Sequence, residues 1–591
     1  MRSLLIYLLL SLSLVATAKA NQLENHPSPY IRMHAHDKVH WQLWSEKVMA
    51  QARQQHRLVF VSIGYFSCHW CHVMRNESFN DTAIAKKLNS QFISVKVDRE
   101  LNPSLDEYLM NFVQKTRGHG GWPLNVFITP DGYPLVGMVY LPKEKFLALL
   151  EKLSSKWQAD PASLTQLAQQ AFLQNKPESP GKPISFNANA VKLEVIEQTK
   201  QFADDLLGGF GAQAKFPSGE YLRLLINITD AKQTWLNEFL QLSLAQMAEL
   251  GLHDVIGGGF FRYTTDPDWH TPHLEKMLYT NASMIRVYTA AAARLKRPGY
   301  LNIANETVAF IRRDMHAKSG GYISALSAQD NRGMEGGSYL WQLEELKRQL
   351  SPGEWQQVQQ QWQLLQQESG EYLPAGLAVA PQWHQLRNKL MIKRLQHPAG
   401  VDDKVLPSWN GYLLQALAEL YGQQPNPTLK SMGDELAGYL QKIAKGGLTR
   451  DMGNGRHHFL EDFAMVAAGL DAWSEQSGWR MPPQLVQKLV KQAFQHFYVE
   501  PGWKLSDQTI LPRPSQPARL SVSHLPAADV VLLRLRRKWQ LNEQIPVTTA
   551  VTGLRQSMLD NPFSWPGRIS LYLEQNGGNI PTYPQSRAEI R

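Results

Sequence analysis

Apolar positions in the N-terminal part of the chain fall into short runs separated by longer amphipathic segments. Runs of about four to eight apolar, β-branched residues are typical of buried strands, and apolar positions every three or four residues are typical of helices. The pattern predicts strands at residues 58–63, 91–98, 124–128 and 134–140. It predicts helices at 41–56, 105–115 and 146–158, and one at 73–88 that is interrupted at Asn80-Asp81. The Asp131-Gly132 pair predicts a tight turn between the last two strands.

From about residue 190 the pattern is helical almost throughout. Roughly twelve amphipathic segments follow, separated by loops rich in glycine and aromatic residues. Helix pairs in this number predict an α/α toroid, with a helical solenoid as the alternative. Between the two parts, residues 175–183 read Asn-Lys-Pro-Glu-Ser-Pro-Gly-Lys-Pro, a composition typical of a linker.

These patterns predict the fold class, which is an α/β domain followed by an all-α toroid. The order β-α-β-α-β-β-α in the first part is that of a thioredoxin fold. The expected domains are residues 21–165, a linker at 166–190, and the toroid at 191–591. A chain of 591 residues with 43% hydrophobic positions is long enough to build two cores.

Residues 1–20 have the pattern of a secretory signal peptide. Arg2 supplies the positive start, residues 4–15 are apolar, and Ala18-Lys19-Ala20 forms a small-residue cleavage site. The apolar run is short for a membrane span. We therefore expect a periplasmic or secreted protein with no stable membrane anchor after leader cleavage; uncleaved anchoring is the alternative.

The formal net charge of +9 is a weak bias over this length. The densest basic run, residues 534–538, lies in a helical pattern, where it most simply forms a solvated face. The chain carries no nucleic-acid-binding motif, so we expect no nucleic-acid partner.

The only two cysteines, Cys68 and Cys71, lie where a predicted strand passes into a helix. Unpaired N–H groups and the helix dipole at such a position stabilise a thiolate. Cys68 is therefore expected to have a lowered pKa and to act as the nucleophile, with Cys71 resolving the mixed disulfide. An imidazolium also lowers a thiol pKa, so His69 is expected to tune Cys68.

Other chemistries fit the same segment. Residues 68–72 read Cys-His-Trp-Cys-His, which matches a haem-attachment pattern. A zinc site could combine both cysteines with nearby histidines, for which the candidates are His34, His36 and His40. A static disulfide would close too small a loop to stabilise much. The strand–loop–helix context and the expected export favour a redox dithiol, with no cofactor and no metal.

Pro123 is the other residue expected at this site. It ends the run Gly120-Gly-Trp-Pro and directly precedes a predicted strand, where a thioredoxin fold places a cis-proline against its dithiol. A cis bond is rare enough to need such a reason, so we predict that the Trp122–Pro123 bond is cis. Pro123 would then be the platform for the backbone of a substrate.

Polar and aromatic residues of the helical part cluster in its loops. Loops that emerge at one end of a toroid converge, so these side chains are expected to line a binding cavity. The predicted lining is Arg262, Trp269, His273, Glu275, Trp409, Asn410 and Asp462. The tryptophans would stack on a sugar or a peptide side chain. The alternative is a set of ion pairs that only fixes the loops.

Several motifs resemble a known family. The most specific are residues 67–74, Ser-Cys-His-Trp-Cys-His-Val-Met, and 272–279, Pro-His-Leu-Glu-Lys-Met-Leu-Tyr. They are similar to thioredoxin-domain proteins typified by spermatogenesis-associated protein 20, over roughly residues 25–470. The resemblance implies a thioredoxin-like domain joined to an (α/α)6 toroid like that of six-hairpin glycosidases and sugar epimerases. It implies the fold rather than a defined activity.

The chain departs from ordinary thioredoxins at Ser62, where they carry a buried acid six residues before the first cysteine. The proton acceptor for Cys71 is then expected to be His72, Glu77, Asp98 or water.

The sequence favours an exported thiol–disulfide oxidoreductase acting on a protein disulfide or a small molecule, with a toroid that binds the substrate or a partner. The alternative is a carbohydrate-active enzyme, a glycosidase or an epimerase, with a structural thioredoxin domain. Its acid–base residues would come from His273, Glu275, Asp330 and Asp462. A third hypothesis is a binding module in which neither domain catalyses a reaction.

Overall fold

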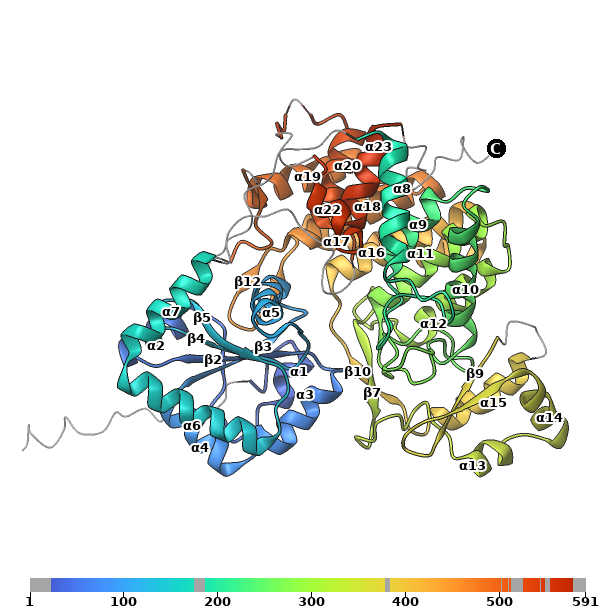
Figure 1. Ribbon diagram of the computed structural model, residues 1–591. Helices are drawn as coiled ribbons and strands as arrows, with labels where there is room; N and C mark the ends of the chain where they lie inside the picture. The colour runs from blue at the N-terminus through green and yellow to red at the C-terminus, as the bar shows by residue number, and fades with distance from the viewer. Residues whose placement is uncertain are drawn as a thin grey trace, which may run out of the picture.

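The computed structural model describes residues 23–174, 186–377, 383–500, 502–508, 510–511, 525–542, 544–547 and 553–577. The expected leader and the proline-rich segment 175–183 lie outside the described residues. A sheet-containing N-terminal domain and a larger helical domain lie side by side (Figure 1).

The N-terminal domain is built on one sheet with the strand order β1-β3-β2-β4-β5. Its strands are β1 (Gln42–Leu43), β2 (Val59–Gly64), β3 (Ile93–Asp98), β4 (Leu124–Ile128) and β5 (Pro134–Met138). β1 and β2 pair parallel with β3, and β4 runs antiparallel to β2 and β5. Every residue of the central strands β2, β3 and β4 is buried, which explains their nearly continuous apolar runs. This is the predicted thioredoxin-like sheet.

Helices cover both faces of this sheet (Figure 1). They are α1 (Pro29–Met33), α2 (Glu46–Gln55), α3 (His69–Met74), α4 (Thr82–Gln91), α5 (Pro103–Arg117), α6 (Lys143–Ala159) and α7 (Pro161–Gln174). The helix predicted at 73–88 is divided, because a π-helical turn (Arg75–Phe79) follows α3 and Asp81 caps α4 by accepting two backbone N–H groups. α7 covers the first part of the expected linker, residues 166–174.

The helical domain closes into a ring. Its inner helices are α9 (Gly219–Ile228), α11 (Leu278–Arg294), α16 (Pro407–Gln423), α18 (Leu460–Ser477), α20 (Ala528–Lys538) and α23 (Pro566–Gln575). Each packs on the next, and α23 returns to α9. The outer helices are α8 (Ala188–Lys200), α10 (Thr234–Glu249), α12 (Tyr300–Asp314), α17 (Pro427–Lys445), α19 (Pro483–Phe497) and α22 (Gln556–Asp560). This is the predicted (α/α)6 toroid.

Helical periodicity did not reveal the strands inserted in this ring. β6 (Lys276–Met277), β7 (Ala325–Asp330) and β10 (Ala399–Asp402) form a small sheet, and β8 (Gln363–Gln366) pairs with β9 (Tyr372–Ala375). Three helices lie beside them, α13 (Leu343–Arg348), α14 (Pro352–Gln361) and α15 (Trp383–Arg394). Two-residue hairpins are formed by β11 (Arg450–Asp451) with β12 (Arg456–His457), and by β13 (Tyr498–Val499) with β14 (Gly502–Trp503). Short strands of this kind carry too few positions for a period to show.

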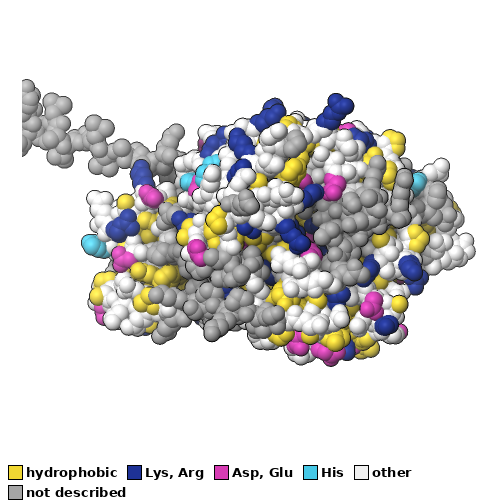
Figure 2. All heavy atoms as spheres, turned by 90° about the horizontal axis from the view of Figure 1, so that it is seen from above, with side chains coloured by type: hydrophobic (Ala, Val, Ile, Leu, Met, Phe, Trp, Pro, Cys, Tyr) yellow, Lys and Arg dark blue, Asp and Glu magenta, His cyan; other side chains and the backbone are white. Residues whose placement is uncertain are grey.

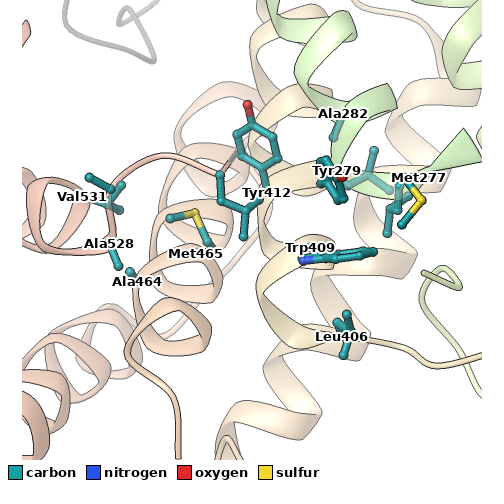
Figure 3. Packing of buried hydrophobic residues seen from close by; sticks show 14 of the residues in the cluster. Met277, Tyr279, Ala282, Leu406, Trp409, Tyr412, Ala464, Met465, Ala528 and Val531 are labelled. Carbon is teal, nitrogen blue, oxygen red and sulfur yellow. The ribbon is translucent and has the colours of Figure 1, made fainter. Parts of the chain in front are cut away.

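The inner helices are buried on nearly all sides, as expected for helices at the centre of a large domain. In Figure 3, Tyr279 of α11 lies against Trp409 of α16, and their ring centroids are 4.8 Å apart. α16 and α18 approach so closely that Gly411 lies on the backbone of Met465. No helix among the described residues has the length and apolar character needed to cross a membrane.

We predict that Gly411→Ala destabilises the toroid by about 1–3 kcal/mol, because the added Cβ would lie 2.5 Å from the backbone of Met465 and force α16 and α18 apart. The matched control is Gly438→Ala in α17, where nothing lies within 4 Å of the added Cβ. That change should be neutral or stabilise by about 0.5–1 kcal/mol, because alanine favours helix. Equal effects of the two substitutions on denaturant unfolding would contradict this account of the α16–α18 contact.

Candidate functional site

The cysteine pair lies at the start of α3, directly after the loop that follows β2. Cys68 is the N-cap residue of α3, and its sulfur accepts the backbone N–H of Cys71 at 3.2 Å. Sγ of Cys68 and Sγ of Cys71 are joined in a disulfide. The two residues are only 3% and 1% exposed, so the pair is covered by its surroundings.

The Trp122–Pro123 bond is cis, as predicted from the sequence. Pro123 is buried at the start of β4, which pairs with β2, the strand that leads to the cysteines. The indole Nε1 of Trp122 donates to Asp106 at 2.8 Å, and its ring centroid lies 5.8 Å from that of Tyr65. The proline and the cysteine loop are thus attached to adjacent strands of one sheet.

The toroid contacts the cysteine loop through Glu275. The carboxylate of this buried residue accepts hydrogen bonds from Ser67 Oγ at 2.6 Å and from Tyr65 Oη at 3.0 Å. Arg262 Nη1 lies at 3.2 Å and His273 Nδ1 at 2.8 Å from Glu275 Oε1. Burial alone would raise the pKa of Glu275, but the charges of Arg262 and His273 and the hydrogen bond from Ser67 lower it to about 2.

The seven residues predicted to line a toroid cavity make contacts within the protein, and none of them lines the cavity between the inner helices. Arg262, His273 and Glu275 come together, but at the interface with the thioredoxin-like domain. Their polar groups are used by the contact between the two domains, a contact that no local pattern in the sequence could indicate.

The other four predicted residues support the loops and helices of the toroid. Trp269 is fully buried and donates to the carbonyl of Leu207 at 2.9 Å, and Trp409 packs on Tyr279. Asn410 accepts the N–H of Tyr322 and donates to its carbonyl. Asp462 accepts from the backbone N–H of Ser408 and pairs with Arg450 at 2.6 Å.

A second toroid side chain lies beside His69, the residue after the first cysteine. Oε2 of Glu335 is 2.6 Å from His69 Nδ1, in an ion-pair contact that lies off the direction of a hydrogen bond. The next residue, Trp70, is 47% exposed and packs on Tyr140, with ring centroids 4.8 Å apart.

None of the side chains proposed as proton acceptor for Cys71 is seen to contact it. His72 Nε2 is bound to the carbonyl of Phe66 at 2.8 Å, Glu77 accepts from Tyr140 Oη, and Asp98 belongs to an ionic cluster described below. Instead, Tyr30 Oη and Cys71 Sγ both lie against Gly64, where a Cβ would overlap with both atoms. This hydroxyl is buried and has no hydrogen-bond partner among the described residues.

Ser62, which replaces the acid of ordinary thioredoxins, pairs in register with Lys96. Lys96 Nζ donates to Ser62 Oγ at 3.1 Å and lies 4.5–5.1 Å from the ring centroids of Tyr30, Trp41 and Phe79. Burial lowers the pKa of Lys96 to about 7. Sequence analysis did not select Tyr30 or Lys96, because both are distant from the cysteines along the chain.

The zinc candidates are not grouped around the cysteines. His34 is buried, with its Nδ1 2.6 Å from Asp37. Across the described residues, no three His, Cys, Asp or Glu side chains are arranged to hold a metal ion.

Comparison with known proteins assigns the chain to a family. The model of the family Thioredox_DsbH, described as a protein of unknown function, DUF255, matches residues 20–175. Spermatogenesis-associated protein 20 of Rattus norvegicus is 31% identical over 540 residues, which cover 78% of this chain and 68% of the rat protein. The chain belongs to the spermatogenesis-associated protein 20 family.

A second relative and a solved structure are also similar to this chain. An uncharacterized protein of Caenorhabditis elegans is 34% identical over 351 residues, which cover 56% of this chain and 48% of that protein. The chain therefore spans about half the length of this relative. The crystal structure of a sugar epimerase from a ruminal bacterium is 12% identical, with a TM-score of 0.42, covering 66% of this chain and 99% of that one.

In this member of the spermatogenesis-associated protein 20 family, a buried ionic cluster also joins the two domains. Lys404 Nζ of the toroid lies 2.6 Å from Asp402, 2.8 Å from Asp98 and 3.2 Å from Glu100, and the latter two belong to the thioredoxin-like domain. One lysine cannot compensate three buried carboxylates. Burial raises the pKa of Glu100 to about 8, and the charges of Asp402 and Asp98 add to this effect.

We predict that Glu100→Gln flattens the pH dependence of stability between about pH 4.5 and pH 8. In the folded protein Glu100 keeps its proton to about pH 8, whereas its ordinary pKa is 4.5. The protonated Glu100 makes its full favourable contribution to the free energy of unfolding below pH 4.5. This contribution is lost as the pH rises through 8, and the free energy of unfolding falls by at most about 1.4 kcal/mol per pH unit. The variant should lack this decline in the free energy of unfolding, measured by denaturant titration.

The control for this prediction is Glu238→Gln, which changes an exposed glutamate of α10. That variant should keep the pH dependence of the wild type. An unchanged slope in Glu100→Gln would show that Glu100 is ionised in the folded protein at neutral pH.

Proposed function

We propose that this protein is an exported thiol–disulfide oxidoreductase, with Cys68 as the nucleophile and Cys71 as the resolving cysteine. The observation that carries the proposal is the disulfide at the start of α3, where the N–H of Cys71 already donates to Cys68 Sγ. A thiolate at this sulfur would keep that hydrogen bond and gain charge–dipole stabilisation. The leader pattern supports a periplasmic or secreted location, where disulfide exchange takes place.

The reaction transfers two electrons from the dithiol to a substrate disulfide. The Cys68 thiolate attacks one substrate sulfur, the substrate S–S bond breaks, and the other substrate sulfur leaves as a thiolate. Cys71 then gives up its proton and attacks Cys68 Sγ, which releases the second substrate thiolate and forms the Cys68–Cys71 disulfide. An external dithiol must reduce this disulfide before the next cycle; with an oxidant in its place, every step runs in reverse.

Access to Cys68 limits which substrates react. Cys68 is 3% exposed, whereas the neighbouring Trp70 presents 47% of its surface beside Tyr140. An apolar segment next to the disulfide of a protein substrate would pack on this aromatic pair. A small disulfide would instead enter without using it. We propose a protein disulfide as the substrate, because only it gains from Trp70.

We predict that Cys71→Ala accumulates a mixed disulfide through Cys68, because the resolving thiol is gone. The reduced variant would be mixed with glutathione disulfide or with a disulfide-bonded model protein and followed by mass spectrometry without reductant. The Cys68→Ala and Cys71→Ala double variant is the control and should form no adduct. If wild-type sulfurs react with an alkylating reagent to the same extent with and without prior reduction, the pair does not cycle.

A cavity in the toroid favours a second candidate function, the binding or conversion of a carbohydrate. It has a volume of about 460 Å3 and is lined by the inner helices, with five acidic and five basic side chains. Figure 2 looks onto the end of the molecule where α20 and α23 lie, and basic and acidic side chains lie close together there. A balanced set of donors and acceptors suits an uncharged polyhydroxylated ligand.

Two glutamates on facing helices are the acid–base candidates in this cavity. Oε1 of Glu419 in α16 accepts from Arg223 and Arg286, at 3.1 and 2.7 Å, and Glu220 in α9 accepts from Tyr412 at 2.6 Å. Oε2 of Glu419 is buried without a hydrogen-bond partner among the described residues. It is therefore an acceptor available to a hydroxyl group. Two of the residues first considered for this role, Asp330 and Asp462, are held in ion pairs with Arg332 and Arg450.

We predict that a sugar which fits this cavity raises the melting temperature of the wild type and not that of Glu419→Gln, because the amide no longer offers two acceptor oxygens. Thermal shifts would be measured with a panel of mono- and disaccharides. Glu238→Gln, outside the cavity, should respond as the wild type does. If no sugar shifts the wild type, or if Glu419→Gln responds equally, the carbohydrate function is not supported.

A further inference from the structure

The loop after β7 reaches from the toroid to the cysteine pair. Asp330, at the end of β7, accepts the backbone N–H groups of Arg332 and Met334 at 2.8 and 2.9 Å. The N–H of Gly336 then bonds to the carbonyl of Ala328 at 2.9 Å. These bonds hold Glu335 between two fixed points, so its backbone position is set by the toroid.

Glu335 points at the residue that directly follows Cys68. Its Oε2 is 2.6 Å from Nδ1 of His69, and the two side chains are 41% and 24% exposed. His72 lies near this pair, because the charges of both His69 and Glu335 act on it, and Tyr263 of the toroid lies near Glu335. Burial lowers the pKa of His72, and the charges of Arg75 and His69 lower it further. Glu335 is therefore the acidic partner of His69.

We propose that Glu335 is a positioning residue that the toroid supplies to the dithiol, and that it sets the reduction potential of Cys68 and Cys71 through His69. The carboxylate holds, by Coulomb attraction, the side chain of His69, the residue that directly follows Cys68 in the chain. A positive charge beside Cys68 stabilises the thiolate of the reduced form. A stabilised reduced form makes the disulfide a stronger oxidant. This inference rests on the proposed oxidoreductase function.

The electron balance of the reduction shows in which direction Glu335→Gln should change the reduction potential. Reduction of the Cys68–Cys71 disulfide takes two electrons, and one of the two sulfurs, Cys68, remains as the thiolate. Glu335→Gln keeps the size of the side chain and removes its charge. The Cys68 thiolate then loses the stabilisation that Glu335 provides through His69. The equilibrium constant for reduction by a dithiol should fall by about tenfold, which corresponds to a potential lower by about 30 mV.

The test is a redox titration of the full-length protein against mixtures of reduced and oxidised dithiothreitol. Glu335→Gln should be harder to reduce than the wild type, and Glu335→Asp, which keeps the charge, should recover part of the difference. Glu344→Gln is the control for the charge change, because Glu344 is exposed on α13. Its potential should equal that of the wild type.

A double-mutant cycle separates action through His69 from a general effect on the fold. In a His69→Asn background, Glu335→Gln should change the potential little, because the group that transmits the charge is absent. The rate of Cys68 alkylation against pH gives a second readout: its midpoint should move to higher pH in Glu335→Gln and not in Glu344→Gln. A looser fold would not produce this pattern.

The outcomes distinguish a failure of the oxidoreductase function from a failure of the role proposed for Glu335. If the wild-type disulfide does not equilibrate with dithiothreitol, the oxidoreductase function itself fails. If the wild type equilibrates but Glu335→Gln has the same potential, or shifts it equally in the His69→Asn background, the function stands and the role of Glu335 is overturned.

Discussion

The candidate site depends on the hydrogen bonds and the ion pair made by the carboxylate of Glu275. It lies in the toroid, yet it accepts hydrogen bonds from two residues of the loop that carries the cysteines, Tyr65 and Ser67. A buried carboxylate is costly unless it is neutralised, and Arg262 supplies the opposite charge from the toroid side. The loop therefore takes its shape from two domains together, and the toroid is part of the candidate site.

The thioredoxin-like domain was predictable from sequence because its signals are local. Continuous apolar runs specified β2, β3 and β4, and the Gly-Gly-Trp-Pro run before β4 specified the position of the cis bond. The short strand β1 was not predicted, because two residues are too few to show an alternating apolar pattern. They form a strand only by pairing with β3. Inner helices of the toroid were recognisable as helices, but their closure into a ring depends on contacts between distant segments.

The residues predicted to line a toroid cavity are used elsewhere for a physical reason. Residues such as Glu275 and Asp462 were selected for their chemistry, and that chemistry is used to neutralise buried arginines at or near the domain interface. The cavity that does exist is lined from inside the helices, by residues such as Glu419 and Arg286. These lie among apolar positions of the inner helices, where a helical pattern alone gives no reason to single them out.

The burial of both sulfurs has a consequence for kinetics, because the surrounding side chains form a cover over them. A partner that must reach Cys68 reacts only in the fraction of time during which the cover is open, so its observed rate is the intrinsic rate multiplied by that fraction. The ionic contacts that join the two domains beside the cysteine loop include buried pairs such as Arg262–Glu275, which dissolved salt screens weakly. Access to Cys68 would then be limited by movement of this cover and would change little with ionic strength.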